Sequence, residues 1–213
     1  MPRRSLRKLP AGLDLSGRLL SFDQLPDPWS GEALFGRAAP LEIEVGSGKG
    51  LFLSAAAAAD PAADFLGIEI APKYAAHIAA RLVRRELTNA QILSGDAHRL
   101  FYERLPDSVV RAVHVYFPDP WWKARHKKRR VMNERFVAAI ERVLSAQGRL
   151  HFWTDVEEYF RTTLELVAEH SRLAGPLPVE EQPALHDLDY RTHFERRTRQ
   201  SGLPVFRAEF RKR

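Results

Sequence analysis

From residue 41 onward, short apolar runs alternate with stretches of helical character, and this alternation limits the fold more than any other feature of the sequence. The apolar runs cover residues 41–45, 65–70, 90–94, 112–117 and 149–153. Alternation of this kind indicates βαβ units that share a parallel sheet. We therefore expect an α/β domain over residues 41–213, built on a single doubly wound, mostly parallel sheet, with a basic arm and loops over residues 1–40 before it.

Helices are predicted between and after these strands. Residues 50–59 are rich in alanine, and residues 72–87 begin with Pro and carry apolar side chains at helical spacing, so both fit crossover helices. A further helix is expected from Asn133, a capping residue, to Gly148, and another over residues 156–170.

Two stretches near the C-terminus have a different character. Residues 174–190 hold three Pro and several acids without any period, so we expect a long loop there. Residues 205–212 alternate apolar and polar side chains, which favours a closing strand or hairpin.

The chain contains no Cys among its 213 residues, which excludes a disulfide scaffold, a thiolate metal site and a cysteine nucleophile. The longest apolar stretch, residues 51–59, is broken by Ser54 and falls short of the roughly 20 residues that a membrane span needs. We therefore expect a soluble, cytoplasmic protein without a metal. The sequence leaves the choice between monomer and homodimer open.

Basic residues outnumber acidic ones by 33 to 27, which gives a net charge of +6. One basic cluster lies at residues 3–8, and another at residues 191–213. A third covers residues 123–130, where six of eight residues are Lys or Arg. Clustering of this kind favours a polyanionic partner such as a nucleic acid.

An acidic residue lies at or just beyond the end of each predicted strand. These residues are Glu44, Glu69, Asp96, Asp119 and Asp155. In open α/β sheets, ligands bind outside the carboxyl ends of the strands. An acidic rim on a basic protein indicates a ligand that is cationic or rich in hydroxyl groups.

The turn after the first strand carries Gly46, Gly48 and Gly50, which let the backbone approach a ligand. Their spacing matches neither the dinucleotide fingerprint nor a phosphate loop. Glu69 is placed to accept hydrogen bonds from a ribose. Glu44 would repel a pyrophosphate, but it suits S-adenosylmethionine, which carries an ammonium and a sulfonium.

Asp96 has two equally good interpretations, one at the adenine end of such a cofactor and one as a helix cap.

The segment after the fourth strand is the most specific part of the sequence. Asp119 lies between two Pro residues and so sits on a stiff loop, as a group that holds a substrate base requires. Of Trp121 and Trp122, we expect one in the core, while the other could offer a face for an unstacked base. Residues 123–130 have the composition of an RNA-contacting loop.

Several functions are compatible with these residues. A nicotinamide-dependent oxidoreductase is disfavoured by Glu44 and by the glycine spacing. A non-enzymatic RNA-binding module would explain the basic clusters but not the acidic rim. Methylation of amines on DNA or protein is a further possibility, since "DPW" is loosely similar to the loop of amine methyltransferases.

Six blocks occur in the order found in one family: "IEVGSGKG", "FLGIEI", "SGDA", "FPDPWWKARHKKRR", "TD" and "THFERR". Over residues 41–213 the chain therefore resembles the bacterial tRNA (guanine-N7)-methyltransferases. The resemblance implies a class I methyltransferase fold that uses S-adenosylmethionine to methylate N7 of a guanosine in the variable loop of tRNA.

The resemblance also implies roles for individual residues. The implied cofactor-binding residues are Glu44, Gly46, Gly48, Glu69, Asp96 and Asp119. Asp119 would also be the catalytic residue. The implied substrate-binding residues are Lys123, Asp155, Thr192, His193, Phe194 and Glu195. Trp122 departs from the family pattern, and so does the segment after residue 200, and both departures bear on how tRNA docks.

Overall fold

The computed structural model describes residues 6, 9–10, 12–181, 183 and 190–213. The basic cluster predicted at residues 3–8 therefore lies almost entirely outside the described residues, as does part of the predicted loop at 174–190. Within the described residues, no helix is long and apolar enough to cross a membrane.

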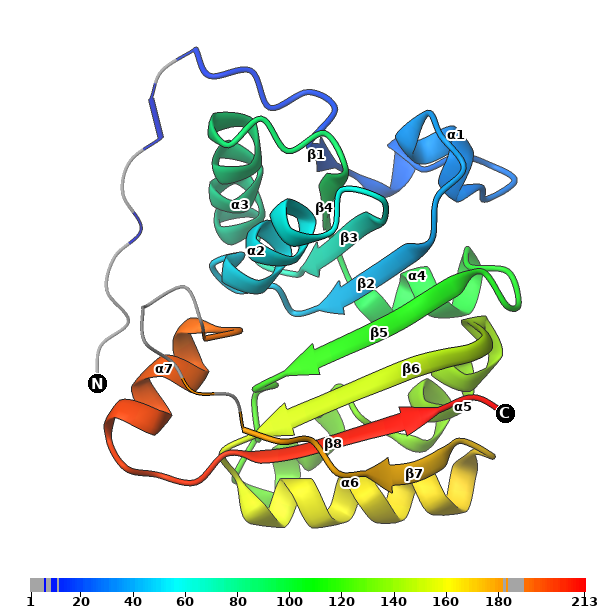
Figure 1. Ribbon diagram of the computed structural model, residues 1–213, viewed down its shortest axis with the longest axis vertical. Helices are drawn as coiled ribbons and strands as arrows, with labels where there is room; N and C mark the ends of the chain where they lie inside the picture. The colour runs from blue at the N-terminus through cyan, green and yellow to red at the C-terminus, as the bar shows by residue number, and fades with distance from the viewer. Residues whose placement is uncertain (1–5, 7–8, 11, 182, 184–189) are drawn as a thin grey trace.

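A single eight-stranded sheet forms the centre of the molecule, in the order β1-β4-β3-β2-β5-β6-β8-β7 (Figure 1). Its strands are β1 (Leu19–Leu20), β2 (Leu41–Val45), β3 (Asp64–Glu69), β4 (Ala90–Ser94), β5 (Val110–Tyr116), β6 (Leu144–Thr154), β7 (Ala174–Leu177) and β8 (Phe206–Arg211). The first six strands pair in parallel, and β8 pairs antiparallel with both β6 and β7. The strand order reverses between β2 and β5, which is where such sheets bind ligands.

Helices cover both faces of this sheet. The α-helices are α1 (Gly31–Phe35), α2 (Leu51–Ala59), α3 (Pro72–Arg84), α4 (Ala97–Glu103), α5 (Glu134–Val143), α6 (Glu157–His170) and α7 (His193–Gln200), and the 3₁₀ helices are η1 (Phe22–Gln24) and η2 (Ala124–Arg129). Helices α2 and α3 lie on one face, α4, α5 and α6 lie on the other, and α7 lies near the carboxyl ends of β5 and β6 (Figure 1). The doubly wound prediction is therefore confirmed.

The apolar positions of the strands and helices form the core. Strand β3 is buried along its whole length, as a central strand covered on both faces must be. On one face, Leu53 of α2 and Ile78 of α3 pack against Phe65 and Ile92. On the other, α4 and α5 belong to the larger apolar cluster, in which Phe101 and Phe136 meet edge to face.

All five predicted strands occur, but three local predictions were wrong. The helix expected to continue to Gly148 ends at Val143, because Leu144 already pairs with Val110 in the sheet. The register between β5 and β6 shifts after this pair, so residues 145–148 have no partner in β5. A Cβ at Gly148 would lie 2.8 Å from a backbone oxygen, so the backbone is tightly packed there.

Two regions expected as loops contribute to the sheet. Residues 174–177 form the edge strand β7, where Ala174 pairs with Arg211. Residues 19–35 hold β1, η1 and α1, and Leu20, Leu25 and Trp29 are buried in the core. The division into an arm and a methyltransferase domain stays a prediction.

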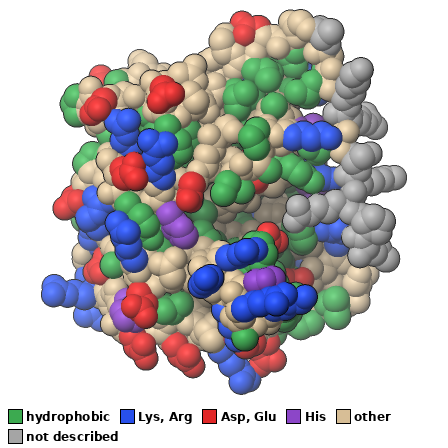
Figure 2. Space-filling model, turned by 180° about the vertical axis from the view of Figure 1, so that it is seen from behind, with side chains coloured by type: hydrophobic (Ala, Val, Ile, Leu, Met, Phe, Trp, Pro, Cys, Tyr) green, Lys and Arg blue, Asp and Glu red, His purple; other side chains and the backbone are tan. Residues whose placement is uncertain are grey.

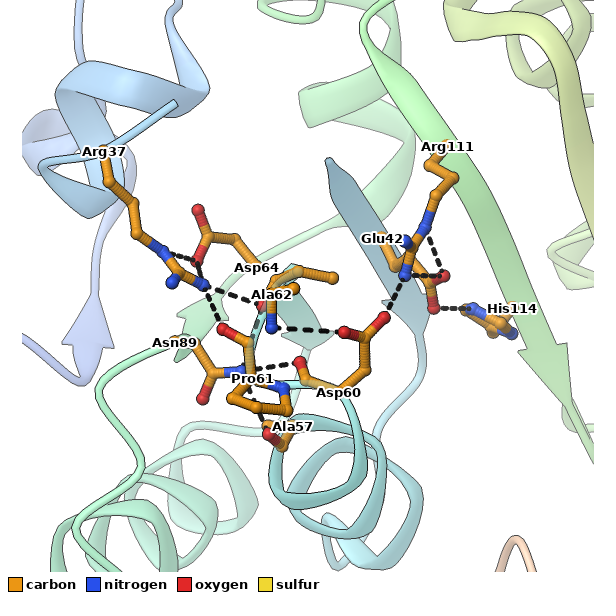
Figure 3. A network of polar contacts seen from close by, with 11 residues as sticks. Arg37, Glu42, Ala57, Asp60, Pro61, Ala62, Asp64, Asn89, Arg111 and His114 are labelled. Atoms are coloured by element: carbon orange, nitrogen blue, oxygen red, sulfur yellow. Dashed lines mark hydrogen bonds and ion pairs between the residues drawn. The ribbon is translucent and has the colours of Figure 1, made fainter. Parts of the chain in front are cut away.

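Paired charges hold the end of the sheet where the strands begin (Figure 3). The Arg37 guanidinium lies 2.7 Å from Asp64, whose side chain is only 2% exposed. Arg111 bridges Glu42 and Asp60 at 2.8 and 2.7 Å. Burial opposes ionisation of Glu42, but hydrogen bonds from His114 and Arg111 hold its pKa below the usual value.

Candidate active site

Two buried carboxylates stand at the opposite end of the sheet, where β2 and β3 finish. Glu44 is 4% exposed and Glu69 is 9% exposed. Each oxygen of Glu69 accepts one backbone hydrogen bond of 2.9 Å, from the amides of Gly48 and Ala71. It therefore ties the glycine-rich turn to the start of α3.

Glu44 is in a different situation. Its Oε2 atom and the hydroxyl oxygen of Ser47 are buried and have no hydrogen-bond partner among the described residues. Burial raises the pKa of Glu44 to about 7, and the charge of Glu69 adds to the shift, whereas the nearby Ser47 hydroxyl and Leu53 amide oppose it. A buried acid without a partner is costly, so this geometry fits a ligand that brings a positive charge.

The glycine-rich turn leaves room for that ligand. Gly46 has φ +78°, and a side chain built there would meet nothing within 4 Å, so its backbone faces open space. Gly50 has φ +67°, and a Cβ built there would lie 2.8 Å from the side chain of Ile78. The turn therefore packs closely against α3, and a residue without a side chain is needed at this position. The turn is therefore open toward a ligand and closed toward the core.

Asp96 follows β4 and begins α4. Its Oδ1 accepts a 2.9 Å hydrogen bond from the amide of His98, so the helix-cap interpretation is confirmed. The amide of Gly95 donates to the Glu69 carbonyl at 3.0 Å, which keeps the end of β4 beside that of β3. The role of Asp96 at the adenine end of a cofactor stays a prediction.

Asp119 lies just beyond β5, which pairs directly with β2. The structure thus places Glu69, Glu44 and Asp119 at or just beyond the carboxyl ends of three neighbouring strands, β3, β2 and β5. The backbone is left-handed on both sides of Asp119, with φ +50° at Phe117 and +46° at Trp121. Asp119 itself is exposed, unlike the two glutamates.

The basic run after Asp119 forms η2 and lies mostly on the surface. Its exposed cations are Lys123, Arg125, Lys127, Lys128 and Arg129, whereas Arg130 is buried. Trp122 is 68% exposed, and Trp121 is partly buried beneath Arg129 and edge-on to His126. Figure 2 shows Lys and Arg side chains gathered around the edge of a hollow on the side of the molecule opposite to the view of Figure 1.

Helix α7 carries the predicted substrate-binding segment at residues 192–195. Thr192 caps the helix by accepting from the amide of Glu195 at 3.0 Å. Phe194 stacks on Phe117, with ring centroids 6.2 Å apart, so the helix lies against the Asp119 loop. Burial and the charge of Arg81 lower the pKa of His193 to about 4.

Glu195 is buried, whereas a residue that contacts a substrate would have to lie at the surface. It is 3% exposed and faces Arg207 of β8 at 3.2 Å, and it also accepts from the amide of Arg191 at 2.7 Å. In this structure it anchors α7 to the sheet. Asp155 is exposed directly after β6, next to β5 in the sheet.

Sequence reasoning missed α7 as a helix, although a signal was present. Thr192 and Glu195 have the spacing of a capping box, which marks a helix start. Within the described ranges, no group of three or more His, Cys, Asp or Glu side chains is placed to hold a metal ion.

Comparison with known proteins agrees with this geometry. A family model described as "Putative methyltransferase" matches residues 38–208. The chain is 51% identical over its full length to the tRNA (guanine-N(7)-)-methyltransferase of Rhodopirellula baltica, covering 81% of that protein. It is 37% identical over 85% of its length to the enzyme of the same name from Alcanivorax borkumensis, covering 76% of it.

Solved structures share the fold at low sequence identity. The 16S rRNA methyltransferase KamB superposes with a TM-score of 0.61 at 16% identity, over 85% of this chain and 91% of that one. The aminoglycoside resistance methyltransferase NpmB1 gives a TM-score of 0.56 at 18% identity, over 84% and 90% of the two chains.

The family model and the curated relatives, taken with the acidic residues at the strand ends, define the class: the protein is a methyltransferase that uses S-adenosylmethionine. The free carboxylate oxygen of Glu44 fits the ammonium group of that cofactor, which has no phosphate to repel. Within the class, the full-length match at 51% identity shows that the chain belongs to the bacterial tRNA (guanine-N7)-methyltransferase family.

Proposed function

We infer that the protein methylates N7 of a guanosine in tRNA, and that the variable loop holds the target. The observation that carries this proposal is the full-length family match on a chain whose buried, unpartnered Glu44 stands next to the Asp119 loop. When bound, S-adenosylmethionine supplies the methyl group.

The residues at the ends of β2 and β3 bind the cofactor in this proposal. Glu44 accepts from its ammonium group, and the backbone at Gly46 permits close approach. Glu69 and Asp96 contact the ribose and the adenine. Both already receive backbone hydrogen bonds, and each carboxylate has lone pairs left to accept from a ligand.

Asp119 acts on the base. The N7 atom of guanine carries an in-plane lone pair at neutral pH, so the transfer needs no general base, and its product ring is cationic. Asp119 therefore has two tasks, which are to orient the base and to stabilise the developing positive charge. Its stiff, exposed loop suits a group that must meet a macromolecular substrate.

The cations of η2 bind tRNA phosphates in this scheme, and Trp122 offers an exposed ring on which an unstacked base can lie. Lys123, Asp155 and the start of α7 complete the substrate side of the rim. The reaction assigns the protein to the compartment where tRNA matures, the bacterial cytoplasm.

The test is a methylation assay with purified protein, labelled S-adenosylmethionine and unmodified tRNA, with products scored for 7-methylguanosine. We expect label at N7, and none when the variable-loop guanosine is replaced by adenosine. Label elsewhere, or none, contradicts the assignment. A thermal shift with NAD but not with S-adenosylhomocysteine would instead favour an oxidoreductase.

A further inference from the structure

Arg130 closes the basic run but does not share the environment of its neighbours. Its side chain is only 8% exposed, whereas that of Lys127 is 47% exposed. Its guanidinium lies 2.6 Å from Glu158 of α6 and 4.4 Å above the ring of Tyr159. A group this enclosed is poorly placed to reach an RNA phosphate.

The same guanidinium also reaches the loop that carries Asp119. The Nε atom of Arg130 donates a 2.8 Å hydrogen bond to the carbonyl of Pro120, which is the residue directly after Asp119. Arg130 thus joins the loop on one side to α6 on the other. Its backbone amide donates to the Lys127 carbonyl at 2.9 Å, which fixes the end of η2 in the same assembly.

The Asp119 loop needs such an anchor. Phe117 and Trp121 both have positive φ, which side-chain-bearing residues adopt only at a cost and which persists where the surroundings hold it. On the Phe117 side, the amide donates to the Trp153 carbonyl at 2.8 Å. On the other side, Arg130 donates a hydrogen bond to the carbonyl of Pro120, the residue that follows Asp119.

We propose that Arg130 is a positioning residue of the methyl-transfer reaction, which holds the Asp119 loop in its working geometry and does not contact RNA. The inference rests on the proposed function. It separates Arg130 from the exposed cations of the run, which the proposed function assigns to phosphate, although Lys127 also contacts Glu158 at 2.7 Å.

The chemistry of Arg fits this task better than that of Lys. A planar guanidinium presents donors in several fixed directions, so one side chain serves the Pro120 carbonyl and the Glu158 carboxylate while its face rests on Tyr159. An ammonium on a flexible stem cannot satisfy all three contacts. The interaction with Glu158 should therefore matter as well, because it orients the guanidinium.

The experiment compares Arg130→Lys and Arg130→Met with Lys128→Met, which removes the same charge from an exposed position of the same run. We expect both Arg130 variants to lose kcat by roughly tenfold or more, since small misplacements of a catalytic group are costly. Their KM for tRNA and affinity for S-adenosylhomocysteine should stay near the wild-type values. Lys128→Met should raise KM for tRNA and leave kcat nearly unchanged.

A second pair of measurements distinguishes positioning from general support of the fold. Glu158→Gln should lower kcat in the same direction as Arg130→Lys, measured at a temperature at which thermal unfolding shows each variant to be folded. Added methylguanidinium should restore part of the kcat of Arg130→Ala. If the Arg130 variants instead raise KM alone, as Lys128→Met does, Arg130 is an RNA contact and the inference is wrong. If the wild-type protein forms no 7-methylguanosine, the proposed function fails instead.

Discussion

The acidic residues at the two ends of the sheet differ in whether they have a cationic partner. Where the strands begin, Asp64 and Glu42 each have an Arg partner, and Asp60 shares one of them (Figure 3). Where the strands finish, Glu44 is buried with no cation beside it among the described residues, and Glu69 accepts hydrogen bonds from the amides of Gly48 and Ala71.

This difference separates acids that hold the fold from acids that await a ligand. Paired carboxylates stabilise the protein as it stands, because their desolvation is offset within the chain. An unpaired one lowers its stability until a cation arrives. The same residue type in the same sheet can therefore have opposite effects on stability, and substitutions at the two ends should reveal this.

The largest effect is expected where the strands begin. Arg37→Met leaves Asp64 buried without its cation and should lower the free energy of unfolding by about 2 to 3 kcal/mol, or roughly 5 to 10 °C, a value reduced because Arg37 is 42% exposed. Thermal unfolding measures it. The control is Arg161→Met, in the exposed pair with Glu157, which should change stability by less than about 1 kcal/mol.

Glu44→Gln should act in the opposite direction. The pKa of Glu44 is raised from 4.5 to about 7, so the folded protein loses stability as pH rises through that interval and carries the full cost at pH 8. Removing the charge should stabilise the cofactor-free protein by about 2 kcal/mol at pH 8, yet weaken S-adenosylhomocysteine binding roughly tenfold or more. A less stable variant with intact binding contradicts the comparison.

Asp119→Ala tests the exposed member of the rim. Because its side chain faces solvent, we expect the unfolding temperature and the affinity for S-adenosylhomocysteine to stay near wild type. Turnover should fall roughly tenfold or more, since the base loses its orientation and its counter-charge. Single-turnover methylation of tRNA measures this, and an active variant would remove Asp119 from the mechanism.

The smallest effect concerns pH. If the ionised form of Glu44 binds the ammonium group, affinity for S-adenosylhomocysteine should fall by up to about tenfold between pH 8 and pH 6, following a pKa of about 7. Calorimetry across that range measures it. The dependence should disappear in Glu44→Gln, and an identical slope in both proteins would mean that another group titrates.

Much of the fold could be predicted because its central strands are recognisable as short apolar runs in the sequence. Runs such as residues 41–45 and 90–94 are short and mostly apolar, as is typical of parallel strands covered on both faces. The edge strands β1 and β7 could not be found this way, since β1 has only two residues and β7 contains Gly175 and Pro176. The helix predicted at α5 is too long because Leu144 continues the apolar spacing of the helix, although Leu144 belongs to β6.

The site was predictable in outline but not in its charges. A rule about strand ends is enough to gather Glu44, Glu69 and Asp119 on one edge. No local pattern shows that Glu44 lacks a partner, or that Arg130 turns inward while Lys128 faces solvent. Those facts depend on side chains from distant elements, such as Glu158, which only the folded chain brings together.

The position of β8 between β6 and β7 has a consequence for how the protein is made. Among the described strands, β7 pairs with β8 alone, so residues 206–211 must leave the ribosome before residues 174–177 can join the sheet. Helix α7 likewise cannot be anchored to the sheet before residues 206–211 emerge, because Glu195 pairs with Arg207 of β8. A chain still being translated can therefore pair strands β1 to β6 first, but it can add β7 and anchor α7 only after residues 206–211 have emerged.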